Sequence, residues 1–236
     1  MYNALRFFAG TKLVEVRTKG MEGIESTSWQ LAHYKEPYAT RRKNKLPAKL
    51  ARFGFGSSVT RDSNILDACC GRGDALELLQ TLGYTNLKGA DGTPQASWLN
   101  APFQCFETDV RRMPFASDTF DYVLNLHALH HFANSEGVIS FLTEVHRVLK
   151  PGGRLLIIDF PASLQIKLLF ALLRRRVGAV TGELKNFADI LDEEWEYLSS
   201  YLQDWPAVRT ALNRGPFEVE RREQDFFLYY LTLKKV

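Results

Sequence analysis

Acidic residues recur where short apolar segments end in the first half of the chain. Asp67 lies in the segment ILDA, Asp91 ends LKGAD, and Asp109 follows the segment at 104–107. An ionised carboxylate only accepts hydrogen bonds, so acids at such positions suit the hydroxyl and amino groups of a ligand. Because the carboxyl ends of parallel strands meet at one edge of a sheet, we expect the three acids to lie together there.

A glycine turn connects the first of these segments to a helix. Residues 65–79 read ILDACCGRGDALELL, which predicts a buried strand, a turn at Gly71 and Gly73, and a helix. Glycines let a ligand approach the backbone, and a helix start offers unpaired N–H groups. The third glycine of the dinucleotide fingerprint is missing, because DAL follows Gly73, so a nicotinamide dehydrogenase is not expected.

Three histidines follow the apolar segment at 121–126. Their spacing would place His127, His130 and His131 on one helical face, which leaves a general base, a packing role or a metal site as alternatives. No acidic or cysteine partner stands at suitable sequence spacing, so no metal is expected. We take His127 as the first candidate for a catalytic base and His131 as the second.

Strand-like and helix-like segments alternate from residue 62 onward. Strands are predicted at 64–68, 87–90, 104–107, 121–126 and 154–159, with helices near 73–82, 94–98 and 135–148. The pattern indicates an α/β fold, with a doubly wound, mostly parallel seven-stranded sheet. A C-terminal antiparallel hairpin at about 216–235 would close the sheet, and a helical cap would be inserted at about 161–214.

The cap is predicted to contain two helices, LQIKLLFALLRRRVGAV and FADILDEEWEYLSSYLQDW. Apolar residues nearly all round the first favour burial, although the arginines that follow also suit peripheral contact of 164–176 with an anionic membrane. In the second helix and at its end, aromatic residues are predicted to form cap core: Trp195, Tyr197, Tyr201 and Trp205. Residues 1–61 are expected to form helices across the site or along the sheet's flank, with Pro37 and Pro47 as starts or breaks.

Composition excludes several classes of protein. The 236 residues are 45% hydrophobic and 24% charged, as in ordinary globular proteins. The net charge of +3 is too small for a dedicated nucleic-acid binder. Three cysteines form no disulfide framework, and neither an export signal nor a membrane-spanning segment is evident, so a cytoplasmic location is expected.

Taken in order from Ser63 to Asp159, these segments resemble the motifs of class I S-adenosylmethionine-dependent methyltransferases. ILDACCGRGD resembles the glycine-loop motif, although Ala-Cys-Cys stands where many relatives carry glycine. FDYVLNLHALHHF and EVHRVLKPGGRLLIID resemble the fourth motif and the later helix, turn and fifth strand. The resemblance implies S-adenosylmethionine as cofactor and S-adenosylhomocysteine as a product.

The resemblance also assigns roles to residues. Asp91 would bind the ribose hydroxyls, and Asp109 with the Val110 backbone would bind the adenine edge; a local turn or capping role is the alternative for each acid. The other donor-binding residues that we predict are Asp67, Ala68, Cys69, Gly71, Gly73, Gly92, Asn125 and Leu126.

The leading interpretation is a methyltransferase for a small-molecule acceptor, with O-, N- and C-methylation all open. The alternatives are a lipid, RNA or protein acceptor, or a protein that binds the donor without catalysis. The basic stretch Arg41, Arg42, Lys43 and Lys45 permits RNA. However, the Asn-Pro-Pro-Tyr type of motif found in amino-methylating relatives is absent after the fourth strand, so a nucleic-acid partner is not expected.

Overall fold

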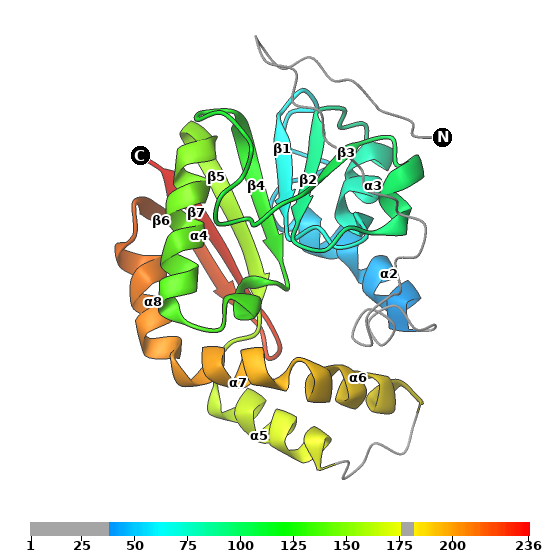
Figure 1. Ribbon diagram of the computed structural model, residues 1–236, viewed down its shortest axis with the longest axis vertical. Coiled ribbons are helices and arrows are strands. Elements are labelled where there is room, and N and C mark those ends of the chain that lie inside the picture. The colour runs from blue at the N-terminus through cyan, green and yellow to red at the C-terminus, as the bar shows by residue number, and fades with distance from the viewer. Residues whose placement is uncertain (1–37, 176–181) are drawn as a thin grey trace.

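The computed structural model describes residues 38–175 and 182–236, which form a seven-stranded sheet with helices on both faces (Figure 1). The strands are β1 (Ile65–Ala68), β2 (Leu87–Asp91), β3 (Gln104–Glu107), β4 (Phe120–Leu126), β5 (Leu149–Asp159), β6 (Phe217–Gln224) and β7 (Tyr229–Lys235). Their order is β3-β2-β1-β4-β5-β7-β6. β1 to β5 are parallel, and β7 is antiparallel to both of its neighbours. The predicted fold class is confirmed.

Helices connect and cover these strands. The α-helices are α2 (Tyr38–Ala51), α3 (Asp74–Thr81), α4 (Ser135–Val148), α5 (Leu164–Arg174), α6 (Gly182–Glu193), α7 (Trp195–Gln203) and α8 (Trp205–Arg214). Two short 3₁₀ helices, η1 (Ala96–Asn100) and η2 (Leu129–Phe132), follow β2 and β4. Predictions that fall on residues 1–37 and 176–181 lie outside the described part of the chain.

The central strands are apolar on both sides because each side faces a different core. Ile65 packs with residues of α2 and α3, whereas the next residue, Leu66, packs with residues of α4 and α8. Leu156 and Leu155 of β5 divide in the same way. Successive side chains of a strand point to opposite faces, so a strand covered twice is apolar at every position. This burial leaves the strand ends as the place for polar ligand contacts.

The chain reverses its direction of winding between β1 and β4. From β1 it continues to β2 and β3 on one side, and β4 then starts the other half of the sheet. In such sheets, ligands bind beside the carboxyl ends of the strands at this switch point. The carboxyl ends of β1 and β4 meet there, with Asp67 opposite Leu124 in the register.

Four local predictions were wrong. The helix predicted at 94–98 is the 3₁₀ helix η1, and Pro47 lies inside α2 without ending it. β5 starts at Leu149, before the predicted Pro-Gly-Gly turn. The second cap helix is broken between α6 and α7. At this break the buried Glu194 contacts the histidines of η2, which a local helical pattern cannot reveal.

Helices α5, α6 and α7 lie beyond the carboxyl edge of the sheet (Figure 1), whereas α8, which falls in the same predicted cap interval of 161–214, packs against α4 and β6. Tyr201 of α7 is buried, and its hydroxyl lies 3.0 Å from that of Tyr229 in β7. Burial was overestimated elsewhere: Tyr197 is 49% exposed, and α5 exposes a row of leucines. This row, hereafter the α5 leucine stripe, consists of Leu164, Leu168 and Leu172, which are 69%, 56% and 52% exposed.

Candidate active site

The turn after β1 has a backbone that favours glycine. Gly71 and Gly73 have φ angles of 51° and 85°, a left-handed conformation that side chains disfavour. A Cβ atom at Gly73 would lie 2.8 Å from the ring of Phe103, so space as well as conformation excludes a side chain there. Cys69 also has a positive φ, 67°. Non-glycine residues in this conformation carry strain, which the surrounding contacts must hold.

Residues of η1 fasten the turn from the other side. The Trp98 indole Nε1–H donates to the Gly71 carbonyl at 2.8 Å, and the Ser97 hydroxyl lies 3.0 Å from the Arg72 carbonyl. Sequence reasoning missed both residues, because the stretch after β2 carries no motif. A tryptophan about 27 positions from its partner has no local signal, and only the fold brings the two together.

Asp91, at the end of β2, is held by two backbone N–H groups. Its Oδ2 accepts from Gly71 and its Oδ1 accepts from Thr93, each at 2.9 Å. Each carboxylate oxygen has two lone pairs, so both oxygens retain capacity for one further donor. A Cβ atom at the next residue, Gly92, would meet no other atom of residues 38–175 and 182–236 within 4 Å. The carboxylate is therefore oriented beside open space.

Asp67 lies deeper, with 3% of its surface exposed. Burial, together with the negative charges of Asp91 and Asp74, raises the pKa of Asp67 to about 8. Without a compensating positive charge, a carboxyl group in such surroundings retains its proton. Burial and the charges of Asp91 and Asp67 likewise raise the pKa of Cys69, so this cysteine remains a neutral thiol. The loop beside the glycine turn thus favours positive charge.

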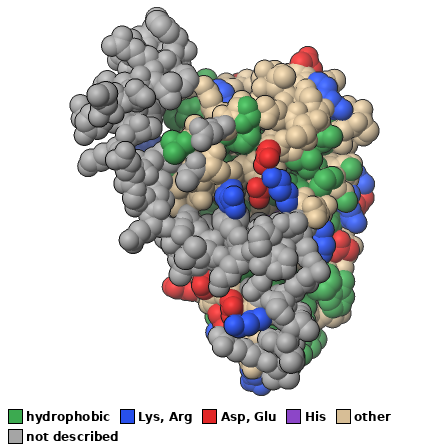
Figure 2. All heavy atoms as spheres, turned by 90° about the vertical axis from the view of Figure 1, so that its right-hand side faces the viewer, with side chains coloured by type: hydrophobic (Ala, Val, Ile, Leu, Met, Phe, Trp, Pro, Cys, Tyr) green, Lys and Arg blue, Asp and Glu red, His purple; other side chains and the backbone are tan. Residues whose placement is uncertain are grey.

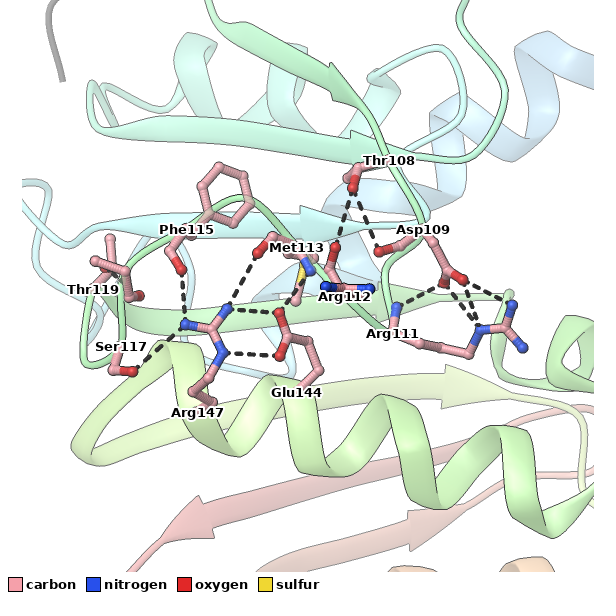
Figure 3. Close-up of polar contacts among 11 residues, drawn as sticks. Thr108, Asp109, Arg111, Arg112, Met113, Phe115, Ser117, Thr119, Glu144 and Arg147 are labelled. Carbon is pink, nitrogen blue, oxygen red and sulfur yellow. Dashed lines mark hydrogen bonds and ion pairs between the residues drawn. The ribbon is translucent and has the colours of Figure 1, made fainter. Parts of the chain in front are cut away.

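Asp109 does not present a free carboxylate (Figure 3). Arg111 binds both of its oxygens through the guanidinium, at 2.8–3.1 Å, and donates its backbone N–H as well. The hydrogen bond from Arg111 lowers the pKa of Asp109. These four contacts occupy the lone pairs of the carboxylate, so an adenine amino group would have to displace part of the Arg111 contact. The predicted adenine role of Asp109 stays a prediction.

The loop that carries Asp109 and the buried Val110 is anchored by helix α4 (Figure 3). Glu144 accepts the Met113 N–H at 2.6 Å and pairs with Arg147, which donates to the carbonyls of Met113 and Phe115. An ion pair one helical turn apart, with four or more contacts to one loop, orients that loop better than an exposed pair does. Both residues were missing from the sequence prediction.

At the end of β4, Asn125 faces the end of β1. It is fully buried, and its Nδ2 donates to the Ala68 carbonyl at 3.2 Å. Its Oδ1 is buried and receives no hydrogen bond from the part of the chain that the structure describes. A buried acceptor of this kind is unfavourable unless a ligand or water supplies a donor. The next residue, Leu126, is half-buried. The switch point therefore combines the polar Asn125 amide with an apolar neighbour.

His127 contacts a residue from well outside the nucleotide unit. Its Nε2 lies 2.6 Å from Nζ of Lys49, which belongs to α2. An ammonium group can only donate, so a charged Lys49 makes Nε2 the acceptor and leaves the proton on Nδ1. His127 has a positive φ of 59°, and its N–H donates to Ile158 in β5 at 2.7 Å. Helix α2 therefore reaches the end of β4 through Lys49. This contact agrees with the predicted alternative in which helices of residues 1–61 lie across the site.

The other two histidines belong to a separate cluster. The three histidines do not share a helical face, because His127 precedes η2 in a left-handed conformation. His130 is buried, and its Nδ1 lies 2.8 Å from the Asp159 carboxylate. Burial opposes its charge, but Asp159 and Glu194 outweigh this and raise the pKa of His130 to about 10. His131 pairs with Glu194 at 3.4 Å and stacks on Tyr197.

Comparison with known proteins agrees with this geometry. The family model described as "Methyltransferase domain" matches residues 66–157, which run from β1 to β5. A 2-phytyl-1,4-naphtoquinone methyltransferase of Nostoc punctiforme is 29% identical over 164 residues, 64% of this chain and 68% of its own length. Together these matches support a class I S-adenosylmethionine-dependent methyltransferase.

Other similar proteins extend the comparison. A demethylmenaquinone methyltransferase of Bacillus licheniformis is 27% identical over 64% of this chain and 68% of its own length. An uncharacterized methyltransferase of Synechocystis is 33% identical, but the match spans about half of that protein, 49%. The structure of the PH0226 protein from Pyrococcus horikoshii shares the fold, with a TM-score of 0.57, 18% identity and coverage of 86% of this chain and 95% of its own.

The residues of this methyltransferase fit S-adenosylmethionine. The donor has a cationic sulfonium and amino group, which suit the negative surroundings of Asp67, and ribose hydroxyls, which suit the oriented Asp91. The open space at Gly92 and the buried Asn125 oxygen add backbone access and an acceptor. A hollow of about 350 Å³ lies instead around Lys150–Arg154 at the amino edge, where none of these groups occurs.

We expect Asp91→Ala to weaken binding of S-adenosylhomocysteine at least tenfold, about 1.4 kcal/mol. The substitution removes the predicted ribose acceptor and the observed partner of the Gly71 N–H. Asp91→Asn should lose less, because one acceptor oxygen remains. Calorimetry measures the affinity, with Asp118→Ala, an exposed acid before β4, as a control. Unchanged binding in Asp91→Ala would remove this residue from the donor site.

We expect Asp67 to make the donor-free protein less stable as pH rises. Its folded pKa of about 8 exceeds the ordinary 3.8, so the unfolded state loses the proton first, and stability falls between about pH 4 and 8. Between pH 5 and 8 the free energy of unfolding of the wild type should fall by about 1 kcal/mol or more through this group, and Asp67→Asn should remove that part of the decline. Urea unfolding at both values measures it, with the exposed Asp62→Asn as control. Parallel pH profiles for wild type and Asp67→Asn would contradict the assignment.

Proposed function

We propose that this methyltransferase acts on a small quinone-class acceptor with an apolar side chain, which it takes from a membrane surface. The relatives named above act on 2-phytyl-1,4-naphtoquinone and demethylmenaquinone, according to their names. The observation on this chain that carries the proposal is the α5 leucine stripe, which exposes apolar surface on the cap. A cytoplasmic enzyme that contacts the membrane peripherally would have this form.

The α5 leucine stripe has the geometry of an interfacial helix. Its members are spaced by four residues, so they form one continuous face, while Ile166, Phe170 and Leu173 are buried on the opposite face. Lys167 and Arg175 are exposed beside it, and Arg174 is held by Asp192 and the ring of Trp195. Apolar residues flanked by cations bind anionic lipid surfaces.

A second apolar group lies at the same end of the sheet. Phe226 and Phe227, in the turn between β6 and β7, are 56% and 51% exposed and touch each other. The register pairs Tyr229 with Asp159 at the carboxyl end of β5, so this turn extends beyond the edge that carries the donor site (Figure 1). No described helix is long and apolar enough to cross a bilayer, so these groups would act at its surface.

Methyl transfer to such an acceptor requires alignment and, for a ring hydroxyl, loss of a proton. The donor supplies an activated methyl group whose leaving group is a neutral thioether, so positioning supplies much of the rate. His127 follows β4, where donor and acceptor would meet, and Nζ of Lys49 reaches it there from α2. Charged Lys49 would stabilise an ionised hydroxyl, and His127 would orient Lys49 or receive the proton once that contact opens. His131, the second candidate, contacts Glu194 instead.

RNA is the alternative acceptor that the basic stretch of α2 raised. Lys43 of this stretch pairs with Glu77 of α3 at 2.7 Å, and both side chains are about half exposed. In Figure 2, basic and acidic side chains are intermixed among the coloured atoms of that face. A duplex or single strand is bound by a continuous basic surface, so this arrangement favours the small acceptor.

The test is transfer of labelled methyl groups to defined acceptors. Reduced demethylmenaquinone in anionic vesicles should become labelled, and a ring analogue without the apolar tail should be labelled at least tenfold more slowly. Total RNA and a protein extract, supplied at equal mass, should remain unlabelled. Label in RNA or protein would replace the proposal, and donor binding without transfer to any acceptor would favour a non-catalytic protein.

Substitutions in the α5 leucine stripe should weaken membrane binding without changing donor binding. Replacing Leu164, Leu168 and Leu172 by Glu should reduce co-sedimentation with anionic vesicles at least fivefold and leave S-adenosylhomocysteine binding unchanged. Ile139→Glu, an equally exposed position on α4, is the matched control and should sediment as wild type. Vesicle binding that survives the triple substitution would end the membrane part of the proposal.

We expect Lys49 and His127 to affect turnover and its pH dependence together. His127→Ala and Lys49→Met should each lower kcat at least tenfold, about 1.4 kcal/mol, without weakening donor binding comparably. Lys49→Arg, which keeps the charge, should retain more activity than Lys49→Met. Profiles of kcat from pH 6 to 9 measure the effect on the proton. A kcat profile identical to wild type in both His127→Ala and Lys49→Met would exclude this pair from the reaction.

A further inference from the structure

We propose that His130, His131 and Glu194 form a binding site for a divalent transition-metal ion, with zinc as the best match, which joins the cap to the edge of the sheet. The site is separate from the donor and acceptor groups described above, and the proposal does not depend on the acceptor. It rests on ligand geometry, on a buried unused nitrogen and on the charge of the surroundings.

The three side chains converge at metal-binding distances. His130 Nε2 lies 3.5 Å from Glu194 Oε2, and His131 Nε2 lies 3.4 Å from Glu194 Oε1. The three potential ligand atoms are all within 4.8 Å of one another. Two ligands bound tetrahedrally to zinc at about 2.0–2.1 Å are about 3.3–3.4 Å apart, so the two Glu194 distances already match, and the most widely separated ligand pair must approach by at most about 1.4 Å.

His130 is oriented as a metal ligand would be. Its Nδ1 and its backbone N–H both contact Asp159, a fully buried acid at the end of β5. Its Nε2 is buried and makes no hydrogen bond with the described part of the chain, although the side chain is only 2% exposed. Zinc-bound histidines commonly direct their second nitrogen at a carboxylate in this way, which fixes the tautomer and the ring.

The charges around His130 favour a dication. Asp159 and Glu194 approach its ring from opposite nitrogens, and both are buried. With a neutral imidazole between them, the two ionised carboxylates carry a charge of −2. A divalent ion would balance this charge completely, whereas a proton on the imidazole would balance half of it. Two imidazoles and one carboxylate suit zinc better than magnesium or calcium, which prefer oxygen ligands.

The position of the site indicates what the ion would do. The two histidines lie in η2, directly after β4, and Glu194 lies at the break between α6 and α7. A metal ion would therefore link the sheet edge to the cap. Three protein ligands leave one position for water or another oxygen ligand, and His131, which is 37% exposed, lies on the accessible side.

The test is metal binding by the full chain after treatment with a chelator. Zinc is titrated against a chromophoric chelator, and cobalt is added separately to record the absorption of a tetrahedral site. We expect one ion per chain, and at least tenfold weaker zinc binding in His131→Ala and in Glu194→Gln. His131 is partly exposed, so its replacement should leave the fold intact, which circular dichroism checks.

His146→Ala is the matched control, because His146 lies on α4 beside Phe217, away from the cluster. It should bind zinc as wild type does. Absence of stoichiometric binding would overturn the proposal and leave His130, Asp159 and Glu194 as a buried ion network. Binding that is unchanged in His131→Ala, or cobalt spectra without tetrahedral character, would place the metal elsewhere and would equally overturn it.

Discussion

The hydrogen bond from the Gly71 N–H to the Asp91 carboxylate holds the predicted donor site together. It joins the turn after β1 to the end of β2, and so connects two neighbouring strands just where their backbone pairing stops. With the Trp98 contact to the Gly71 carbonyl, it fixes a left-handed turn that would otherwise be one of several loop conformations. The same contact orients Asp91, while Asp67 is buried within β1 between β2 and β4. A preorganised carboxylate of this kind loses little freedom on binding a ligand.

Buried negative charge recurs along the carboxyl edge of the sheet and is balanced in two different ways. Around Asp67, whose pKa burial raises, the balancing charge would come with the cationic donor. Around Asp159 it comes from the chain itself, through His130, and in our proposal from a metal ion. Both acids lie at or next to the carboxyl ends of parallel strands that are covered on both faces, and both are buried, so water is largely excluded from each. In this setting a single charge strongly changes affinity.

The donor and acceptor sides are built from different parts of the chain. Donor groups lie on strand ends and adjacent turns within about 60 residues, and the packing of the sheet positions them. The candidate acceptor groups come from α2, which supplies Lys49, and from the cap, which supplies the leucine stripe. Segments outside the sheet can change in length and composition without disturbing it. A common donor site can therefore serve acceptors of many kinds.

The sequence alone determined where the strands of the nucleotide unit lie along the chain, its glycine turn and the acids near its strand ends, because local periodicity and backbone preference specify them. It did not reveal contacts between distant segments: Lys49 with His127, Trp98 with the turn, and Arg111 over Asp109. Sequence spacing also argued against a metal because no acid stands near the histidines, yet the broken cap helix brings Glu194 to them from more than 60 residues away. Side-chain clusters depend on how helices pack over the sheet, and only the tertiary structure decides that packing.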